Sequence, residues 1–476
     1  MRELSLPLSM VSHERRVQEI SDRMEDFYEN GVKPRITHNA THSTRPGEME
    51  HGDDVINVGH LNEFLEIDEE QGKIVMEPDI RMDELVAKTL EHGFIPKVVP
   101  ECPGITVGGA IQGGAAESSA FKYGLVHETC EEYELVLGDG SIVRASGDEN
   151  EDLFAGTACS YGTLGILTKV KMDLIPAKEY VRLTYHRVDS WQEAVEQFKQ
   201  RMDDDVDFID AILFSEELGV VMTGELTEDV QEPVQTFTNL TDEYFYIHAK
   251  DRAQAHEEVT ETIPIQDYFF RYDRGGFWAV DMMCDYFHIP NIRIMRLLLS
   301  PFLNTANIYR AAHAGNVTTK FFVQDIAVPN GLIDEVMNWE QEDPEIYPLW
   351  LCPGKPSDGD DRLSPAYQDC DFGINVGMYG IPKEDHMAAN KALERLTVEK
   401  GGRIALYAHQ HYSEEDFWTV YDKEWYTNLR EKYNAEQAFE DVYERTYTDP
   451  ETVGAPSFLS ALVEFFKPPE RLKIIK

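Results

Sequence analysis

The stretch TVGGAIQGGAAESSAFKYG, residues 106–124, contains five glycines, four alanines and two serines. It follows FIPKVVP, residues 94–100, a predicted strand. A backbone that must come close to a ligand needs residues with small side chains and free φ angles. The stretch therefore predicts either a ligand-binding surface or a tightly packed loop, and its composition alone favours neither.

Two common glycine motifs are absent from this stretch. It contains neither G-x-G-x-x-G, the fingerprint of Rossmann dinucleotide sites, nor G-x-x-x-x-G-K-[ST], the phosphate-binding P-loop. A ligand at these glycines is therefore expected to be bound in another way.

The rest of the sequence predicts an α+β unit followed by a unit with longer strands. Short alternating segments such as VINV, FLEID and KIVMEP indicate strands, and YELVLGDGSIVRAS indicates a hairpin. After Lys178 come longer candidates such as YVRLTYHRV, and residues 421–447 read as one C-terminal helix. Because 476 residues exceed one ordinary domain, we expect three segments, 1–178, 179–400 and 401–476.

The charge of the chain is strongly negative. Asp and Glu number 88 and Lys and Arg 43, which gives a formal net charge of −45. Such a surface repels phosphate backbones, so we expect no nucleic-acid partner. An acid excess spread along the whole chain predicts a halophilic protein that depends on salt screening, although a merely acidic enzyme is the alternative.

The cysteines and the N-terminus indicate a cytoplasmic protein. Six cysteines are scattered without C-x-x-C spacing, so we expect neither a metal site nor a disulfide framework. The N-terminal segment MRELSLPLSMVSHERR has no apolar run long enough for a signal peptide or an anchor.

The order of motifs supports a more specific interpretation. VINVGHLNEFLEIDEEQGKIVMEPDIRMDELVAKTLEHGFIP, TVGGAIQGG, YELVLGDGSIV and GTLGILT follow one another. In this order the chain resembles FAD-binding oxidoreductases of the vanillyl-alcohol-oxidase (PCMH-type) superfamily. It resembles the delta-24 sterol reductase family more narrowly, through VMTGELT, FFVQDIAVP, EIYPLWLCP and EEDFWTVYDKEWYTNLREK. The resemblance implies a two-subdomain FAD-binding domain, an α/β cap domain with an antiparallel sheet, and a C-terminal segment that returns to line the flavin.

The resemblance also implies the residues that hold FAD. In the glycine-rich stretch, main-chain N–H groups would cradle the pyrophosphate, and the implied residues are Thr106, Val107, Gly108, Gly109, Ala110, Ile111, Gln112, Gly113, Gly114, Ala115, Ala116, Glu117 and Ser118. A second segment would contribute Gly162, Gly165 and Thr168. In the first pyrophosphate loop, residues 38–47, only His42 and Ser43 match the superfamily pattern R-G-G-G-H-S. Because the glycines before His42 are missing, we expect non-covalent FAD rather than a histidyl link.

For the reaction, the resemblance implies reduction of an isolated alkene at the end of a sterol or isoprenoid side chain, with NADPH as the hydride donor. Such an alkene has no carbonyl to accept charge, so hydride delivery needs a positioned acid and dry walls. The acid candidates are Tyr407, His409, His411 and Tyr412 in YAHQHY, and Glu117. The alternatives are ordinary strand residues and a helix-cap carboxylate.

Two other functions stay open from the residues. One is an oxidase or dehydrogenase of the same superfamily that acts on an alcohol or hydroxy acid. The other, a flavin-free binding protein, is disfavoured by the glycine stretch.

One segment is unusual for so acidic a chain. Residues 286–324 contain no Asp or Glu, and within them IRIMRLLLSPFLN, from Ile292 to Asn304, is apolar apart from two arginines. This segment predicts either a buried helix of the cap domain or an exposed contact with a membrane interface. The expected partner is a hydrophobic small molecule, and the oligomeric state stays open.

Overall fold

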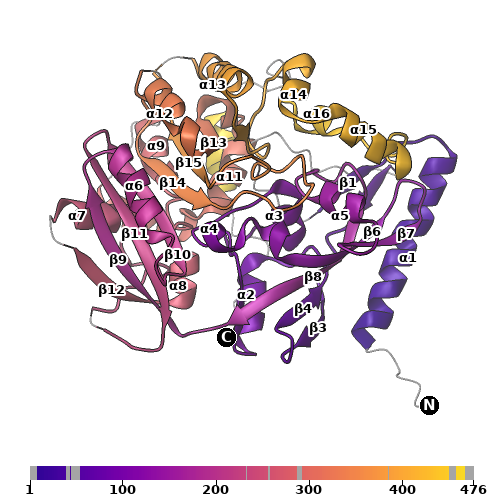
Figure 1. Ribbon diagram of the computed structural model, residues 1–476, viewed down its shortest axis with the longest axis horizontal. Helices are drawn as coiled ribbons and strands as arrows, with labels where there is room; N and C mark the ends of the chain where they lie inside the picture. Colours follow the sequence, from indigo (N-terminus) through magenta and orange to yellow (C-terminus); the bar gives the residue numbers. More distant parts are fainter. Residues whose placement is uncertain are drawn as a thin grey trace.

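The computed structural model of the protein contains, in its described residues, two β-sheets and one small pair of parallel strands (Figure 1). The described residues are 8–38, 43, 54–231, 233–255, 258–286, 292–342, 344–383, 385–449 and 457–466. One sheet belongs to the N-terminal unit and the other to the cap domain. The expected α+β class, with an antiparallel sheet in the cap, is confirmed.

The N-terminal sheet has the order β3-β4-β8-β6-β7, and β5 pairs separately with β8. Its strands are β3 (Phe64–Asp68), β4 (Lys73–Met76), β5 (Phe94–Pro96), β6 (Cys130–Val136), β7 (Ile142–Ser146) and β8 (Ile166–Pro176). Beside it, β1 (Arg35–Thr37) and β2 (Val55–Asn57) pair in parallel. The helices of this unit are α1 (Leu8–Glu29), α2 (Met82–Leu90), α3 (Val107–Gly113), α4 (Ala120–Tyr123) and α5 (Glu151–Thr157).

The predicted hairpin explains how α1 is held against this sheet. Gly140 closes the turn between β6 and β7 with φ of +84°. The Ser21 hydroxyl of α1 donates to the Gly140 carbonyl at 2.6 Å. A Cβ at Gly140 would lie 2.7 Å from the Ser21 carbonyl, so glycine is needed both for the turn and for the close approach of the helix.

The cap sheet is antiparallel throughout, in the order β12-β9-β11-β10-β14-β15-β13-β16. Its strands are β9 (Tyr180–Val188), β10 (Phe208–Ser215), β11 (Leu218–Thr227), β12 (Val259–Pro264), β13 (Phe322–Pro329), β14 (Leu349–Gly354), β15 (Gly373–Gly380) and β16 (Arg403–Ile404). Its helices are α6 (Trp191–Arg201), α7 (Phe245–Gln254), α8 (Ile265–Phe269), α9 (Ala279–Tyr286), α10 (Arg293–Leu299), α11 (Thr305–Ala314), α12 (Ile333–Glu342) and α13 (His386–Lys400). The sheets change between β8 and β9, near residue 178. At the other end β16 pairs with β13, so the cap sheet continues past residue 400.

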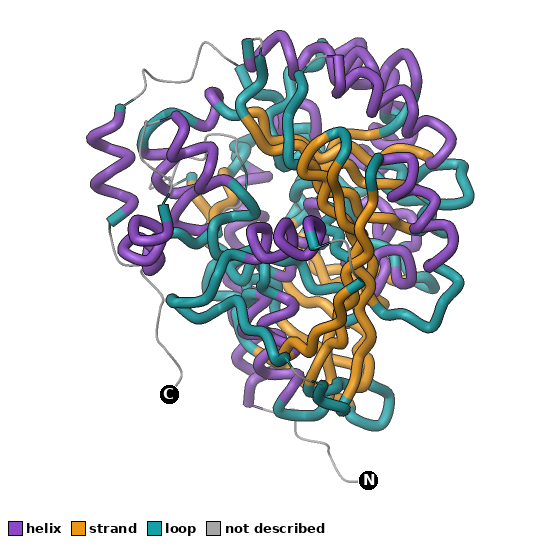
Figure 2. The backbone as a smooth tube through the Cα atoms, turned by 90° about the vertical axis from the view of Figure 1, so that its left-hand side faces the viewer, coloured by secondary structure: helices purple, strands orange, loops and turns teal. Residues whose placement is uncertain are grey.

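The C-terminal segment spans both units. It forms α14 (Glu414–Val420), α15 (Lys423–Lys432), α16 (Val442–Thr446) and α17 (Phe458–Phe465). The prediction of one helix over residues 421–447 is wrong, because Asn434 adopts φ of +54° after α15. Helix α15 packs on α5 of the N-terminal unit, whereas α17 packs on α11 of the cap. Figure 2 shows α17 at the margin of the molecule, between the grey segments that flank it.

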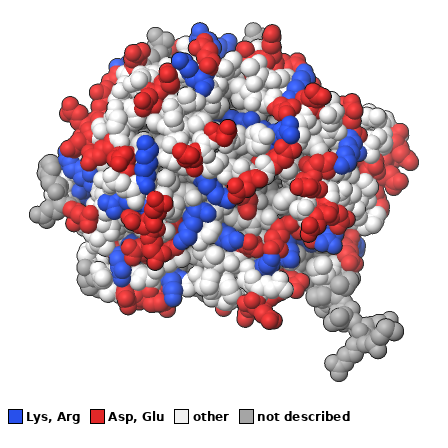
Figure 3. Space-filling view, in the orientation of Figure 1, with Lys and Arg blue, Asp and Glu red and all other residues white. Residues whose placement is uncertain are grey.

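Acidic side chains are scattered over the visible face of the molecule, among basic and uncharged residues, as Figure 3 shows. They lie over both units rather than in one patch, which agrees with their even spread along the sequence. No helix within the described ranges is both long and apolar enough to span a membrane.

Candidate active site

A groove runs along the N-terminal unit, facing the cap domain in one part and the C-terminal segment in the other. It consists of two cavities of about 460 Å³ and 220 Å³. The larger cavity lies between α3 on one side and β13, β14, β15, α9 and α11 on the other. The cavities form one groove because the same residues border both: His38, Thr106, Gly109, Gln112, Tyr161 and Arg445.

The glycine-rich stretch begins with the short helix α3. The Thr106 hydroxyl caps this helix by accepting from the Gly109 amide at 3.1 Å. The side chains of Val107 and Ile111 are fully buried in the core and do not line the groove. The groove is instead lined by the small and polar members of the stretch: Thr106, Gly108, Gly109, Ala110, Gln112, Gly113, Gly114, Ala115 and Ala116.

The first amides of α3 are not directed at a ligand. The Val107 amide donates to the Ile80 carbonyl and the Gly108 amide to the Pro78 carbonyl, both at 2.8 Å. With the Gly109 amide on Thr106, all three N–H groups are bonded within the protein. The expectation that these amides cradle a pyrophosphate is therefore wrong for this turn. The glycine at 108 has a packing reason, since its Cβ would lie 2.8 Å from the Pro78 Cβ.

Other glycines fit the approach of a flat cofactor. A Cβ at Gly113 would meet nothing nearer than Tyr161 Cε1 at 4.0 Å, and one at Gly162 nothing nearer than Gln112 Oε1 at 3.8 Å. Both positions open into the groove, so side chains there would occupy its space. The small residues along α3 thus match a flavin nucleotide that lies along the groove.

In the second predicted segment, too, some residues line the groove and one does not. Gly162 and Gly165 line the smaller cavity, together with Thr163, which the sequence did not single out. Thr168 points elsewhere: its hydroxyl donates to Glu134 Oε1 at 2.9 Å inside the sheet, and it is fully buried. The structure therefore places Thr168 outside the groove.

Of the first predicted loop, His42 lies outside the described residues. Ser43 lines the larger cavity. Its hydroxyl donates to the Tyr407 carbonyl at 2.6 Å, and His313 Nε2 lies 2.7 Å from the Ser43 carbonyl. Ser43 therefore joins the N-terminal unit to the two segments that close the cavity.

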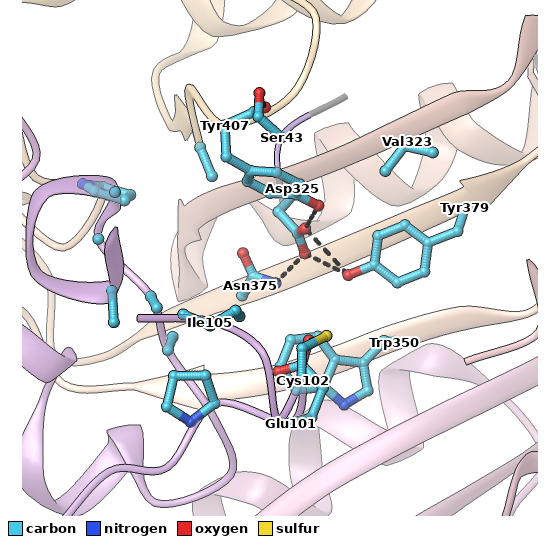
Figure 4. Close-up of a pocket in the computed structure, with 18 of the residues that line it drawn as sticks. Ser43, Glu101, Cys102, Ile105, Val323, Asp325, Trp350, Asn375, Tyr379 and Tyr407 are labelled. Atoms are coloured by element: carbon cyan, nitrogen blue, oxygen red, sulfur yellow. Dashed lines mark hydrogen bonds between the residues drawn. The ribbon is translucent and has the colours of Figure 1, made fainter. Parts of the chain in front are cut away.

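A buried carboxylate on β13 forms the polar centre of the larger cavity (Figure 4). Asp325 accepts hydrogen bonds from three side chains: Tyr407 OH at 2.6 Å, Asn375 Nδ2 at 2.6 Å, and Tyr379 OH at 2.9 and 3.1 Å. Burial raises the pKa of Asp325, and these donors oppose the rise. Since every contact is a donor, the network suits the ionised carboxylate.

A second carboxyl faces the same cavity from the N-terminal unit. Glu101 follows β5, and Figure 4 shows it with Cys102 across the cavity from Asp325. The Cys102 thiol donates to Glu101 Oε1 at 3.4 Å. Burial raises the pKa of Glu101 to about 7, and the negative charges of Glu117 and Asp325 add to the rise. Glu101 is therefore a carboxyl that holds a proton near neutral pH.

Glu117 has a structural role. It is buried, and its Oε1 accepts from Arg271 Nη2 at 3.0 Å. Arg271, also buried, bonds Asp210 of β10 at 3.0 Å with the same nitrogen. Glu117 lines neither cavity, so its proposed role as an acid is not supported by its position. The three charges instead join the N-terminal unit to the cap.

Among the candidates in YAHQHY, only Tyr407 lines the cavity. His409 and His411 are buried behind it, where their Nδ1 atoms contact the Thr448 hydroxyl and carbonyl at 3.2 and 2.9 Å. Tyr412 is buried against Thr397 at 2.5 Å. The expectation that the two histidines line the flavin site is therefore not met, because the chain turns at residues 406–408 and separates Tyr407 from the histidines that follow it.

Asp325, Asn375, Tyr379 and Glu101 were not predicted. One signal for Asp325 was available, because it is the only charged residue in FFVQDIAVP, a strand that is otherwise largely apolar. Among the described residues, no group of three or more His, Cys, Asp or Glu side chains is placed to hold a metal ion.

Comparison with known proteins supports the same cofactor. Residues 10–146 match a family described as FAD binding domain. The Delta(24)-sterol reductase of Macaca fascicularis is 31% identical over 452 residues, which cover 91% of this chain and 86% of that protein. The enzyme of that name from Homo sapiens is 30% identical over the same shares. The one from Arabidopsis thaliana is 28% identical over 426 residues, covering 82% of this chain and 75% of that protein.

Proposed function

The chain belongs to the Delta(24)-sterol reductase family of FAD-dependent oxidoreductases, and from this premise we propose that it reduces an isolated C=C bond in the side chain of a sterol or another isoprenoid. We also propose NADPH as its hydride donor. The observation that carries the proposal is the carboxyl of Glu101, which lies in the wall of a largely apolar cavity where burial raises its pKa to about 7.

The walls of the cavity support an apolar substrate. Most of the side chains that line it away from α3 are aliphatic, aromatic or sulfur-containing, among them Met282, Met283, Ile308, Phe321 and Val323. Such walls exclude water from a reacting alkene and strengthen electrostatic interactions inside the cavity. A volume of about 460 Å³ is in the range of small-molecule sites.

Glu101 is the acid we assign to the reaction. Reduction adds one hydride and one proton to the two alkene carbons; flavin bound in the groove and reduced by NADPH would supply the hydride. Burial raises the pKa of Tyr407 above its ordinary value of about 10. The carboxylic acid of Glu101, with a pKa of about 7, is therefore stronger by at least about three pK units, or roughly a factor of a thousand. An alkene is a weak base, so the stronger acid is favoured.

Asp325 has the complementary role. Protonation of the alkene leaves positive charge on the more substituted carbon, and an ionised carboxylate in the same cavity stabilises it. Tyr407, Tyr379 and Asn375 hold this carboxylate in place, so its orientation is set before substrate binds.

One observation favours a second function. Asp325 with Tyr407 OH at 2.6 Å also resembles a base that removes a proton from an alcohol. An alcohol oxidase or dehydrogenase of the same superfamily would use the pair in this way, and Glu101 would then have no role.

Anaerobic titration separates the two functions. NADPH should bleach the yellow protein, and an isoprenoid alkene should restore its absorbance with formation of the saturated product. Bleaching by an alcohol in the absence of NADPH would contradict the reductase and support the alternative.

A further inference from the structure

Two neighbouring helices at the margin of the cap domain expose an apolar surface. The large apolar side chains of this surface, here called the α10–α17 patch, are Ile292, Ile294, Leu297, Leu298, Leu459, Leu462, Val463 and Phe466. They make up eight of the fifteen exposed large hydrophobic residues found among the described residues. Leu298 and Leu459 have 67% and 71% of their surface exposed, so the patch is not a core face.

The two helices are joined through the turn that follows α10. Phe302, which follows α10, contacts Phe465 and Phe466 at the end of α17, with ring centroids 6.0 and 4.9 Å apart. No residue of α10 is buried. The alternative of a buried cap helix for residues 292–304 is therefore wrong for α10.

The charge of the patch differs from that of the protein. Helix α10 carries Arg293 and Arg296 and no acidic residue, in a chain of net charge −45. Helix α17 has one acid, Glu464, whose carboxylate lies 4.0 Å from Arg310 of α11. An apolar surface with arginines at its edge fits the boundary between acyl chains and anionic headgroups.

The patch also lies directly outside the substrate cavity. Ala461, on the same helix as Leu459 and Val463, lines that cavity with Ile308 and Ala312 of α11. The contact between α11 and α17 is close, since a Cβ at Gly315 would lie 2.7 Å from the Ala461 Cβ. One thin helical layer therefore separates the exposed patch from the apolar cavity.

We propose that the α10–α17 patch rests on a phospholipid surface, with its leucines among the acyl chains and Arg293 and Arg296 at the headgroups. A lipid-soluble substrate then passes from the bilayer to the cavity behind α17 without crossing water. This passage rests on the proposed function, whereas the membrane contact does not. A second copy of the chain fits the patch less well, because two molecules that each carry a net charge of −45 repel one another.

Vesicle flotation tests the contact without any turnover. The holoenzyme is mixed with phosphatidylcholine vesicles, with and without phosphatidylserine, in low salt and in molar KCl. We expect wild-type protein to float with the vesicles, at least in molar KCl, where the repulsion of the acidic surface is screened. Leu298→Asp combined with Leu459→Asp should lower the bound fraction by roughly tenfold or more. Val230→Asp is the matched control, because Val230 is 49% exposed and lies outside the patch.

Three results would overturn the proposal. They are wild-type protein that does not float at either salt concentration, equal flotation of the double variant, or a wild-type dimer that the double variant converts to monomer without any vesicle binding. The flavin spectrum and melting temperature of each variant show whether it is folded. If the protein floats but does not reduce an alkene, the membrane contact stands and the proposed function fails.

Discussion

Gly377 of β15 lies directly opposite Asp325 of β13, and any side chain at this position would push the carboxylate and its tyrosine apart. In the register of the two strands Asp325 pairs with Gly377. A Cβ on Gly377 would lie 2.5 Å from Tyr379 OH and 2.9 Å from Asp325 Oδ1. The glycine thus leaves the space in which Tyr379 reaches across to the carboxylate.

Gly377→Ala should therefore damage the site more than the fold. We expect displacement of Tyr379 from Asp325, a loss of alkene reduction of roughly tenfold to a hundredfold, and destabilisation of about 1–3 kcal/mol. Single-turnover reoxidation of the flavin by the alkene measures the loss of reduction, and thermal unfolding measures the destabilisation. Gly331→Ala is the control, because nothing lies within 4 Å of its Cβ position. Unchanged turnover in Gly377→Ala would show that Tyr379 does not position Asp325.

Glu101→Gln should remove the acid while leaving flavin reduction intact. We expect NADPH to bleach the variant at the wild-type rate and alkene reduction to fall by roughly a hundredfold or more. In wild-type protein the carboxyl must be protonated to act. Its pKa is about 7, so the rate should be constant below pH 6 and fall about tenfold per unit above pH 8. A reduction step in Glu101→Gln with the same rate and pH profile as the wild type would rule out this assignment.

Gly113→Val should impair flavin binding. The Cβ position at Gly113 opens into the groove, so branched methyl groups would occupy the space of the cofactor. We expect purified variant with less than about a tenth of the wild-type flavin content and near-native secondary structure. Gly147→Val, at a position where no atom lies within 4 Å of the Cβ, should keep its flavin. Full occupancy in Gly113→Val would place the cofactor elsewhere.

Arg271→Met should destabilise the contact between the units. It leaves Glu117 and Asp210 buried without their shared cation, which we expect to cost about 3–5 kcal/mol in the free energy of unfolding. Adding Glu117→Gln should recover part of that loss, because one uncompensated charge is removed. Denaturant unfolding measures both. If Arg271→Met unfolds like the wild type, the ion pairs do not hold the units together.

Salt should stabilise the protein. Screening weakens the mutual repulsion that a net charge of −45 produces, so we expect the melting temperature to rise steeply up to molar KCl. A melting temperature independent of KCl would mean that the acidic surface is not an adaptation to salt, and would leave the flavin site unaffected.

The sequence predicted the N-terminal unit well because its signals are local. Alternation along β3 and β4 and the glycine turn of the β6–β7 hairpin each depend on a few neighbouring residues. The stretch that contains helix α3 was assigned to the cofactor through the family resemblance, because its small residues alone favoured neither a ligand surface nor a packed loop. Which of its members face the groove was not predictable, since Val107 and Ile111 turn inward with the helical period.

Most of the side chains to which we assign a role in the reaction were missed, because they meet through long-range register. Asp325 and Asn375 are fifty residues apart and converge only because β13 and β15 are antiparallel neighbours. The pattern YAHQHY shows two imidazoles but not which face they occupy, and only Tyr407 lies at the cavity. Glu101 differs from the other glutamates of the chain by its place in the cavity wall. The residues next to it in the sequence do not reveal that place.

The return of α15 to the N-terminal unit has a consequence for biosynthesis. Tyr426 and Arg430 bond the hydroxyl and the carbonyl of Thr163, each at 2.7 Å, and thereby brace the segment that carries Gly162 and Gly165. Until these C-terminal residues have left the ribosome, that wall of the groove lacks its support. We therefore expect the newly made chain to acquire its cofactor only after Tyr426 and Arg430 have emerged, so that flavin supply acts late in synthesis rather than when the N-terminal unit first appears.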